Sequence, residues 1–353
     1  MRAVLMERGK LWVEEIPTPQ PGPGQVLVKS RACGICGSDL HAAQHTETFV
    51  QTSIEAGGAF KLTTFNPVVL GHEFCAEIVD YGPSTTAAFA PGNLVCSVPM
   101  LMAAQHGHTT AQPPRAVGYD DQAHGGFAQY MLLSETLLRP VPNGLDPTFA
   151  ALTEPMAVGL HAVNKAELKG QETIVVVGCG PVGLAVLTAL AERRARFNET
   201  FGPIIAADYS PARREMAVRQ GADVVIDPKL THPLELPQAT SKNMVIFECV
   251  GVPGLLDDLF LKAPANTQIV VVGVCLQTDH IRPLIAINKE LKLQFVLGYS
   301  LQEFSDSLQL IGEGRFDVAE LVSHRISLDE VASTFEDLKA PDTHGKVIVE
   351  PWR

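Results

Sequence analysis

The sequence is poor in positive charge. Its 353 residues include 27 lysines and arginines against 39 aspartates and glutamates, which gives a formal net charge of -12. A surface with this balance repels phosphate backbones and anionic lipid headgroups. We therefore expect neither nucleic acid nor a membrane among the partners.

Uninterrupted apolar runs are also missing. The first ten residues, MRAVLMERGK, contain no apolar stretch long enough for the core of a signal peptide. The most apolar segment, residues 174–190, is broken by three glycines and a proline, so it does not resemble a membrane span. The seven cysteines are an odd number scattered over a long chain, which argues against a disulfide framework. We expect a reduced, cytoplasmic protein.

The length suggests two domains, and the pattern of apolar residues, prolines and glycines changes along the chain in agreement with this. Residues 1 to about 150 are rich in proline, glycine and short apolar runs, which are typical of short strands joined by turns. Between residues 156 and 297, apolar runs alternate with helical segments, which predicts a parallel, doubly wound sheet. Its buried strands are expected at 174–177, 204–207, 224–226, 244–247 and 269–272.

The remaining segments are less regular. Helices are predicted at 301–312 and 328–339, and a final strand at 346–350. Residues 97–126 form a long stretch without a clear secondary-structure signal. Loops of this length are uncommon in compact domains and are often functional.

A glycine-rich motif follows the first predicted strand of the doubly wound sheet. The order strand, Gly178-x-Gly180-x-x-Gly183, helix allows a tight turn, close approach of a pyrophosphate and close helix–strand packing. Pro181 suits the first turn of the helix, where a missing amide costs little. We expect the dinucleotide to contact Gly178, Gly180, Pro181, Val182 and Gly183.

An acid follows at the spacing that dinucleotide-binding proteins use. Asp208 ends the second apolar run, about 25 residues after Gly183, and is expected to accept a hydrogen bond from the adenosine ribose. A carboxylate there repels a 2′-phosphate and so favours NAD over NADP. Arg213 and Arg214 follow closely and are an argument for the phosphate. The alternative is a glycine turn that binds nothing.

Candidate metal ligands are dispersed along the first part of the chain. Cys33 and Cys36 form a single CxxC pair, so a closed four-cysteine zinc site is not expected. One thiolate with His72, Glu73 and Glu154 would suit a catalytic zinc that keeps an open position. Each residue also has an ordinary explanation, as a buried apolar thiol, a core histidine or a helix N-terminal acid. Local chemistry alone leaves both interpretations open.

The ordered set of motifs resembles the zinc-containing medium-chain alcohol dehydrogenases, in the branch of sorbitol, threonine and butanediol dehydrogenases. The resemblance runs nearly from end to end. It includes GICGSDLH at 34–41, LGHE at 70–73, GGFAQY at 125–130, EPMAVGLHA at 154–162, the glycine motif, FECVG at 247–251 and GKVIVEP at 345–351. It implies a GroES-like, mainly β catalytic domain (1–155 and 298–353) and a Rossmann NAD-binding domain (156–297).

The resemblance also implies roles for individual residues near the metal. Cys36 and His72 resemble the zinc ligands, and Glu154 resembles the variable third ligand. Glu73 resembles the neighbouring acid that enters the zinc shell when the fourth position exchanges. Asp39 resembles the acid that orients the ligand histidine. Cys33 is then not a ligand.

Further residues resemble the parts of the family that handle the proton and the cofactor. Ser38 and His41 resemble the relay that carries the substrate proton to solvent. Lys346 resembles the basic residue that meets the cofactor phosphates. Arg213, five residues after Asp208, resembles the cation beside the adenosine ribose.

One departure from the family concerns its second metal. Most zinc members carry four closely spaced cysteines that bind a structural zinc, whereas residues 97–126 contain no cysteine. We therefore expect one catalytic zinc and no structural zinc. A replacement site is the less favoured alternative to a solvated loop, and its candidate ligands are His106, His108, Asp120, Asp121 and His124.

The function implied is reversible oxidation of an alcohol, either a secondary alcohol or a polyol, to a carbonyl compound with NAD as hydride acceptor. The rivals are a zinc-free quinone or enone reductase of the same fold and a non-catalytic NAD-binding protein. We expect a homodimer or homotetramer, with residues 291–298 as a plausible edge strand for assembly.

Overall fold

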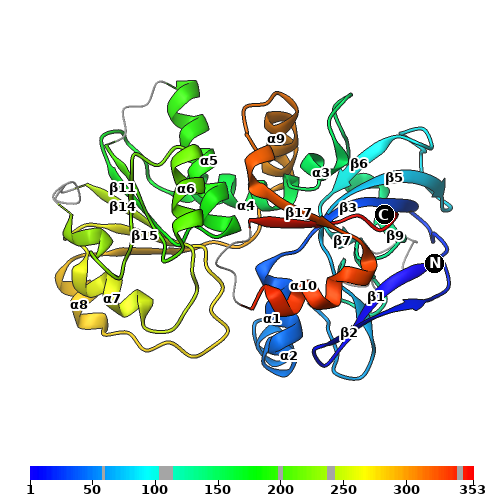
Figure 1. Ribbon diagram of the computed structural model, residues 1–353, viewed down its shortest axis with the longest axis horizontal. Coiled ribbons are helices and arrows are strands. Elements are labelled where there is room, and N and C mark those ends of the chain that lie inside the picture. Colours follow the sequence, from blue (N-terminus) through cyan, green and yellow to red (C-terminus); the bar gives the residue numbers. More distant parts are fainter. Residues whose placement is uncertain (58–59, 103–113, 198–201, 237–242, 340–344) are drawn as a thin grey trace. The chain divides into compact units, whose positions relative to one another are not determined.

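The chain forms two compact units. The computed structural model describes residues 1–57, 60–102, 114–197, 202–236, 243–339 and 345–353. One unit comprises Met1–Glu154 and Val322–Arg353, and the other comprises Pro155–Leu321 (Figure 1). Residues 298–321, which the sequence assigned to the catalytic domain, thus lie in the second unit. There, Glu303 accepts hydrogen bonds from His161 and Asn164, at 2.8 and 2.9 Å.

The first unit is built on a seven-stranded sheet. Its order is β10(Leu138–Pro140), β6(Leu94–Ser97), β5(Glu73–Tyr81), β3(Gln25–Gly34), β18(Lys346–Val349), β17(Val322–Ile326), with β9(Tyr130–Ser134) also pairing with β3. β3 is the longest strand and is mostly buried. Because β18 pairs with β3, the end of the chain completes the sheet that its beginning started.

Smaller elements surround this sheet. β1(Arg2–Glu7) pairs with β2(Lys10–Glu15) and β4(Val68–Val69) in a separate three-stranded sheet. Helices α1(Gly37–Gln44) and α2(Thr46–Glu55) follow β3 directly, and α3(Pro147–Ala150) follows β10; the next helix, α4(Thr153–Lys165), belongs almost wholly to the second unit. The segment predicted as one helix at 328–339 divides into a 3-10 turn at Leu328–Glu330 and α10(Val331–Asp337).

The stretch 97–126 is not structureless where it is described. It contributes β7(Met100–Leu101) and β8(Arg115–Ala116), which pair with each other. Residues 117–127 then run beside residues 69–71, because the amides of Gly125, Gly126 and Phe127 donate to the carbonyls of Val69, Gly71 and Leu70. His106 and His108 lie outside the described residues.

The second unit confirms the predicted parallel, doubly wound sheet. Its strand order is β13(Val224–Ile226), β12(Ile204–Ala207), β11(Thr173–Val177), β14(Met244–Glu248), β15(Gln268–Val271), β16(Lys292–Phe295), and every pair is parallel. The chain reverses its direction of travel across the sheet between β11 and β14. In such sheets, ligands bind where that reversal occurs, at the carboxyl ends of the strands.

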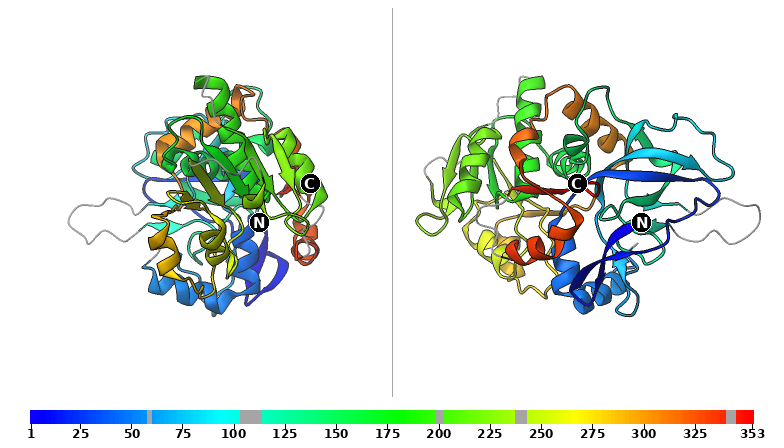
Figure 2. Two further views of the ribbon diagram at one scale, coloured as in Figure 1. Left: turned by 90° about the vertical axis from the view of Figure 1, so that its left-hand side faces the viewer. Right: turned by 45° about the vertical axis from the view of Figure 1, so that its right-hand side comes forward.

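Helices cover both faces of this sheet. α5(Pro181–Phe197) and α6(Pro211–Arg219) lie on one face, and α7(Leu255–Lys262) and α8(Pro283–Asn288) lie on the other (Figures 1 and 2). Alternate strand residues such as Val175 and Val177 pack against Leu259 and Phe260 of α7. Burial on both faces explains why the strands are almost wholly apolar in sequence. α9(Leu301–Gly312) follows, with a capping box between Ser300 and Glu303.

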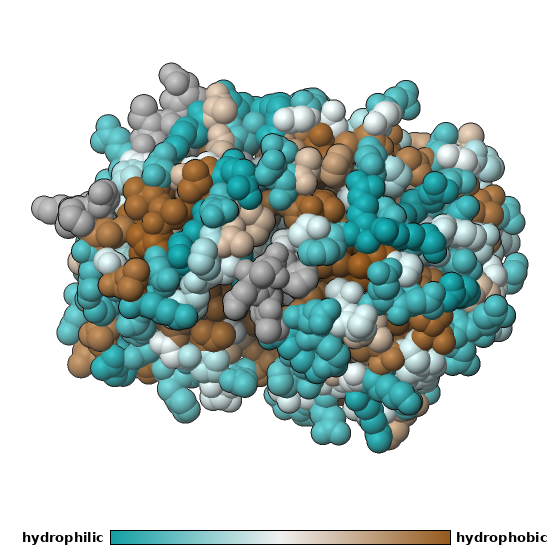
Figure 3. Space-filling view, viewed as in Figure 1, coloured by the Kyte–Doolittle hydropathy of each residue, from teal (hydrophilic) through white to brown (hydrophobic). Residues whose placement is uncertain are grey.

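The exposed surface is mixed in character. On the face drawn in Figure 3, hydrophilic residues cover most of the surface and hydrophobic residues form separate patches between them. Among the described helices, none combines the length and apolar character that a bilayer crossing requires. All seven cysteines are free thiols.

Candidate active site

The site begins where β3 ends and α1 starts. Cys36 is the N-cap of α1, with extended backbone dihedrals of φ -96° and ψ 155°. Its amide donates a hydrogen bond to Oδ2 of Asp39, at 3.0 Å. This hydrogen bond is one half of a capping box. It satisfies the Cys36 amide at the start of the helix and holds the Asp39 carboxylate close to the turn between β3 and α1.

His72 and Glu73 come from the neighbouring strand. Gly34, at the end of β3, pairs with Glu73, at the start of β5, so the residues on either side of this pair are brought together. One candidate ligand atom each of Cys36, His72 and Glu73 lies within 4.8 Å of the other two. A Cβ at Gly34 would lie 2.1 Å from Oε2 of Glu73, so only glycine leaves space for this carboxylate.

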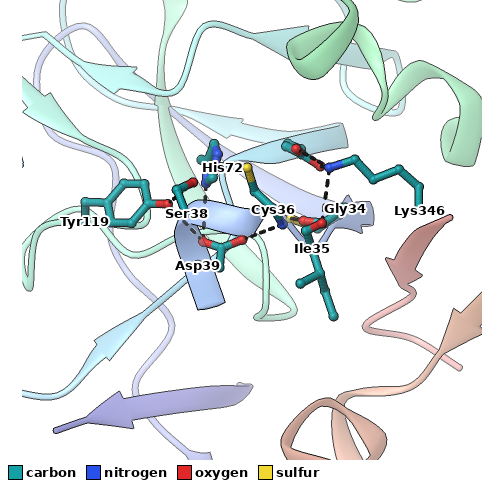
Figure 4. Close-up of polar contacts among 10 residues, drawn as sticks. Gly34, Ile35, Cys36, Ser38, Asp39, His72, Tyr119 and Lys346 are labelled. Carbon is teal, nitrogen blue, oxygen red and sulfur yellow. Dashed lines mark hydrogen bonds and ion pairs between the residues drawn. The ribbon is translucent and has the colours of Figure 1, made fainter. Parts of the chain in front are cut away.

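Asp39 orients the imidazole. Its Oδ1 lies 3.3 Å from Nδ1 of His72, and both side chains are buried (Figure 4). This leaves Nε2 as the ring nitrogen available on the side of Cys36, with which His72 also interacts. Burial lowers the pKa of His72, but the negative charges of Asp39 and Cys36 outweigh burial and raise it well above the ordinary value.

Cys33 has different surroundings from Cys36. It lies outside the three-residue cluster and is fully buried, with Gly71 and Gly126 close to its sulfur. Burial raises the pKa of the Cys33 thiol, and the nearby carboxylates of Asp39 and Glu73 raise it further. A thiol that resists deprotonation is a poor metal ligand.

Lys346 lies buried next to Glu73. Its ammonium donates to both carboxylate oxygens of Glu73 and to the carbonyl of Ile35. Burial lowers the pKa of Lys346, but Glu73 and other negative groups, including Glu154, raise it above its ordinary value. Lys346 thus lies against one of the three candidate metal ligands, and its expected contact with the cofactor phosphates stays a prediction.

Glu154 stands in the first turn of α4 and is half-buried. Its charge contributes to the pKa of Lys346, so it lies in the same neighbourhood. Among the described residues, however, the compact ligand cluster contains Glu73 and not Glu154. The choice between these two carboxylates as third ligand therefore stays a prediction.

Ser38 and His41 lie one turn apart on α1 and are both partly buried. Nδ1 of His41 is buried and makes no hydrogen bond to the described residues. Burial lowers the pKa of His41, and the nearby His45 lowers it further. A neutral imidazole on this helix is able to accept a proton.

Tyr119 is a site residue that the sequence analysis missed. Its hydroxyl lies 2.8 Å from Oγ of Ser38 and 3.2 Å from Oδ1 of Asp39 (Figure 4). Burial and the charges of Asp39 and Cys36 raise the pKa of Tyr119 well above its ordinary value. Two signals point to this stretch without naming Tyr119: the unusual length of the segment 97–126 and the family-like GGFAQY motif that follows.

The acidic and histidine residues near Tyr119 have protein partners. Asp120 is buried, and each of its carboxylate oxygens lies 2.9 Å from the same guanidinium nitrogen of Arg115, which donates to them. Asp121 accepts from the Asn66 amide, and Nδ1 of His124 faces the amide of Val69 at 3.4 Å. Within the described residues, these side chains form no second ligand cluster.

The glycine motif of the second unit has the geometry that close approach requires. Gly178 has a φ of 89°, and a Cβ at Gly183 would lie only 1.8 Å from the Gly178 carbonyl oxygen. Gly180 differs, because its Cβ would meet only the Arg213 guanidinium, at 3.9 Å. Pro181 and Val182 begin α5. The space beside Gly180 lies at a helix N-terminus, where a phosphate is favoured.

Asp208 follows β12 beside this loop. Its carboxylate accepts hydrogen bonds from the amides of Cys179 and Ser210, both 2.8 Å long. Arg213 lies 3.9 Å from the same carboxylate, and its Nε is buried without a partner among the described residues. Arg214 instead donates to the carbonyls of Asp208 and Tyr209.

These residues fit the two groups that the sequence implied. A thiol, an imidazole and a carboxylate around one point are a donor set that zinc accepts. The open side of Gly180 and the unpaired Nε of Arg213 suit an anionic dinucleotide. Together, the mainly β unit with its ligand cluster and the doubly wound unit with its glycine loop define a metal-dependent dehydrogenase.

Comparison with known proteins agrees with this class. Residues 22–143 match the alcohol dehydrogenase GroES-like domain, and residues 181–313 match the zinc-binding dehydrogenase family. (R,R)-Butanediol dehydrogenase of Bacillus subtilis is 33% identical over 347 residues, covering 96% of both chains.

Solved structures show the same likeness over the whole chain. The crystal structure of 2R,3R-butanediol dehydrogenase from Bacillus subtilis has a TM-score of 0.80 at 29% identity, covering 99% of both chains. A protein of Sinorhizobium meliloti described as a zinc-binding dehydrogenase and solved bound to NADP has a TM-score of 0.80 at 26% identity, also covering 99% of both chains. The chain belongs to the zinc-binding alcohol dehydrogenases, and the protein is an oxidoreductase, as the sequence predicted.

The glycine geometry predicts opposite outcomes for two similar substitutions. Gly180→Ala should fold normally and weaken dinucleotide binding, because the added methyl meets little protein and occupies the space beside the loop. Gly183→Ala should lower the free energy of unfolding by about 2–3 kcal/mol, because its methyl overlaps the Gly178 carbonyl. Thermal unfolding measures the stability of both variants, and titration with NAD measures their dinucleotide binding. Loss of stability in Gly180→Ala would contradict it.

Proposed function

We propose that the protein oxidises a secondary alcohol or a diol reversibly to the ketone, with NAD and a single zinc ion. The observation that carries this proposal is the cluster of Cys36, His72 and Glu73 beside the helix that bears Ser38 and His41. The substrate class rests on the butanediol dehydrogenase relative, which acts on a secondary alcohol by its name. The aromatic rings of Phe49, Phe60 and Tyr119 provide apolar surroundings near His72.

Cys36, His72 and either Glu73 or Glu154 would hold the metal. When bound, zinc supplies a Lewis acid that lowers the pKa of a coordinated hydroxyl, and NAD supplies the hydride acceptor. Asp39 keeps the imidazole of His72 in the orientation that ligation needs. Lys346 compensates the charge of Glu73 in a buried position, where a lone carboxylate would be strongly disfavoured.

Ser38 and His41 would move the proton. Ser38 accepts the hydroxyl proton of the substrate and passes its own hydrogen onward, and His41 finally accepts a proton and releases it to solvent. The unpaired Nδ1 of His41 and its lowered pKa support this role, because both leave the imidazole ready to accept.

Several features support NAD over NADP. The Asp208 carboxylate would repel a 2′-phosphate at the adenosine ribose, and Arg214 is engaged by backbone carbonyls and by Asp227. Arg213 is the remaining cation close to Asp208. The Sinorhizobium meliloti structure was solved bound to NADP, so the same assay should compare both cofactors.

Zinc content and alcohol-dependent NADH formation test the function together. We expect about one zinc per chain, and NADH but little NADPH formation with (R,R)-butanediol or another secondary alcohol. Cys36→Ser should lose zinc and turnover yet retain NAD binding, because the glycine loop belongs to the other unit. Cys33→Ala is the matched control and should keep its zinc, because Cys33 lies outside the cluster.

The outcomes separate the rivals. Two zinc ions per chain would mean that a second site exists. An active protein without zinc, after zinc has been added back, would favour a zinc-free reductase, and an inactive protein that binds NAD would favour a non-catalytic binder. Retention of zinc by Cys36→Ser would remove Cys36 from the ligand set.

The relay predicts a specific pH dependence. Alcohol oxidation should decline on the acid side as His41 becomes protonated, at a pH below the ordinary histidine pKa because burial and His45 lower the pKa of His41. His45→Gln removes a positive neighbour, raises that pKa and should move the acid limb of the kcat profile to higher pH. His41→Ala should reduce kcat at least about tenfold, with partial rescue by added imidazole. His41 would be excluded from the relay if His45→Gln left the acid side of the kcat–pH profile in place and His41→Ala left kcat unchanged.

We infer further that two copies pair through β16. Among the described strands, this one is at the edge of the parallel sheet and pairs only with β15, and all four of its residues are exposed. Large apolar side chains accompany it: Phe295 is 63% exposed, Leu297 82%, and Ile287 of α8 68%. An apolar open edge favours pairing with a second sheet edge.

Substitution at this edge tests the assembly. Phe295→Lys should shift a dimer or tetramer toward a smaller species in sedimentation velocity, because it places a charge within the apolar edge. Leu230→Lys changes a residue that is 84% exposed elsewhere in the same unit and should leave the assembly intact. Equal behaviour of the two variants would exclude β16 as the interface.

A further inference from the structure

Tyr119 places a phenol hydroxyl against the serine of the relay. The hydroxyl oxygen lies 2.8 Å from Ser38 Oγ and 3.2 Å from Asp39 Oδ1, and the residue is only 3% exposed (Figure 4). Tyr119 stands outside the helix that carries Ser38 and comes from the segment after β8. Its contact with Ser38 therefore depends on how that segment folds back.

The position of Tyr119 is determined from several sides. Its amide donates to the Ala116 carbonyl at 3.1 Å, and its carbonyl accepts from the Lys61 amide at 2.9 Å. The next residue, Asp120, is fully buried and paired with Arg115. The ring contacts Phe49 and Phe60, with centroid distances of 5.6 and 4.8 Å. The hydroxyl thus has little freedom to leave Ser38.

Tyr119 has one hydroxyl hydrogen for its two contacts, with Ser38 and with Asp39. A tyrosine hydroxyl has one hydrogen to donate, and a serine hydroxyl has one hydrogen and two lone pairs. The 2.8 Å distance to Ser38 is that of an ordinary O–H···O bond, whereas 3.2 Å to Asp39 is long for a charge-assisted one. With Tyr119 as the donor in the shorter contact, Ser38 keeps one lone pair for the substrate and its own hydrogen for onward transfer.

We propose that Tyr119 is a positioning residue that orients the Ser38 hydroxyl for proton transfer from the substrate alcohol. The inference rests on the proposed function, in which Ser38 accepts that proton. In this step the substrate O–H bond breaks and a new Ser38 Oγ–H bond forms, while the original serine hydrogen passes to the next acceptor toward His41. Ser38 stays neutral, and Tyr119 keeps its proton throughout.

Tyr119→Phe isolates the hydroxyl because the ring and its packing remain. In the zinc-loaded enzyme with (R,R)-butanediol and NAD, we expect kcat to fall about three- to tenfold, the range for losing one hydrogen bond, with KM nearly unchanged. The solvent deuterium isotope effect on kcat should increase because proton transfer becomes more limiting. Tyr81→Phe is the matched control, since the Tyr81 hydroxyl bonds the Phe89 carbonyl instead, and it should leave kcat unchanged.

A double-mutant cycle with Ser38→Ala distinguishes positioning from general support. If Tyr119 acts through Ser38, Tyr119→Phe should have no further effect on the residual rate of Ser38→Ala. An equal loss in both backgrounds would overturn the proposal, as would a raised KM with unchanged kcat, which would indicate direct substrate contact. A wild-type enzyme inactive with secondary alcohols, or a fully active Ser38→Ala, would instead overturn the proposed function and this inference with it.

Discussion

The candidate site depends on the antiparallel pairing of β3 with β5. Gly34, the last residue of β3, pairs with Glu73, the first residue of β5. The turn after β3 and the residue before β5 therefore lie side by side. That one register places Cys36 next to His72 although 35 residues of chain separate them. A slip by one residue would turn Glu73 to the other face of the sheet and separate the ligand cluster. The absence of a side chain at Gly34 is what permits the register at this point.

Buried charges then organise the site around this pair. Asp39 contacts the Cys36 amide, the His72 imidazole and the Tyr119 hydroxyl, so one carboxylate links a candidate metal ligand, a helix terminus and the proposed relay. The second buried acid, Glu73, is balanced by Lys346 from the last strand. Buried ion pairs contribute little net stability because desolvation offsets their attraction, and removing one partner is costly. Their role here is to hold geometry, which a metal site requires.

The segment between residues 97 and 126 contributes to the site through residues 115–127. Its described part is held against residues 69–71 by backbone hydrogen bonds and by the close approach of Gly118 and Gly125 to Gly71. The Arg115–Asp120 pair closes the turn that carries Tyr119. The described part of this segment thus brings an aromatic hydroxyl to the serine of the proposed relay.

The sequence by itself determined the two-domain class, the parallel strands of the second unit, the glycine loop with Asp208 and the family, because these follow from local periodicity and contiguous motifs. It also named Cys36, His72 and Glu73, through motifs whose residues are adjacent in the chain. Only the tertiary structure decided that Lys346 faces Glu73, that Glu73 rather than Glu154 joins the compact cluster, and that Tyr119 meets Ser38. The Tyr119–Ser38 and Lys346–Glu73 contacts join residues 81 and 273 positions apart, and no local pattern encodes such contacts because they arise from strand register and loop packing.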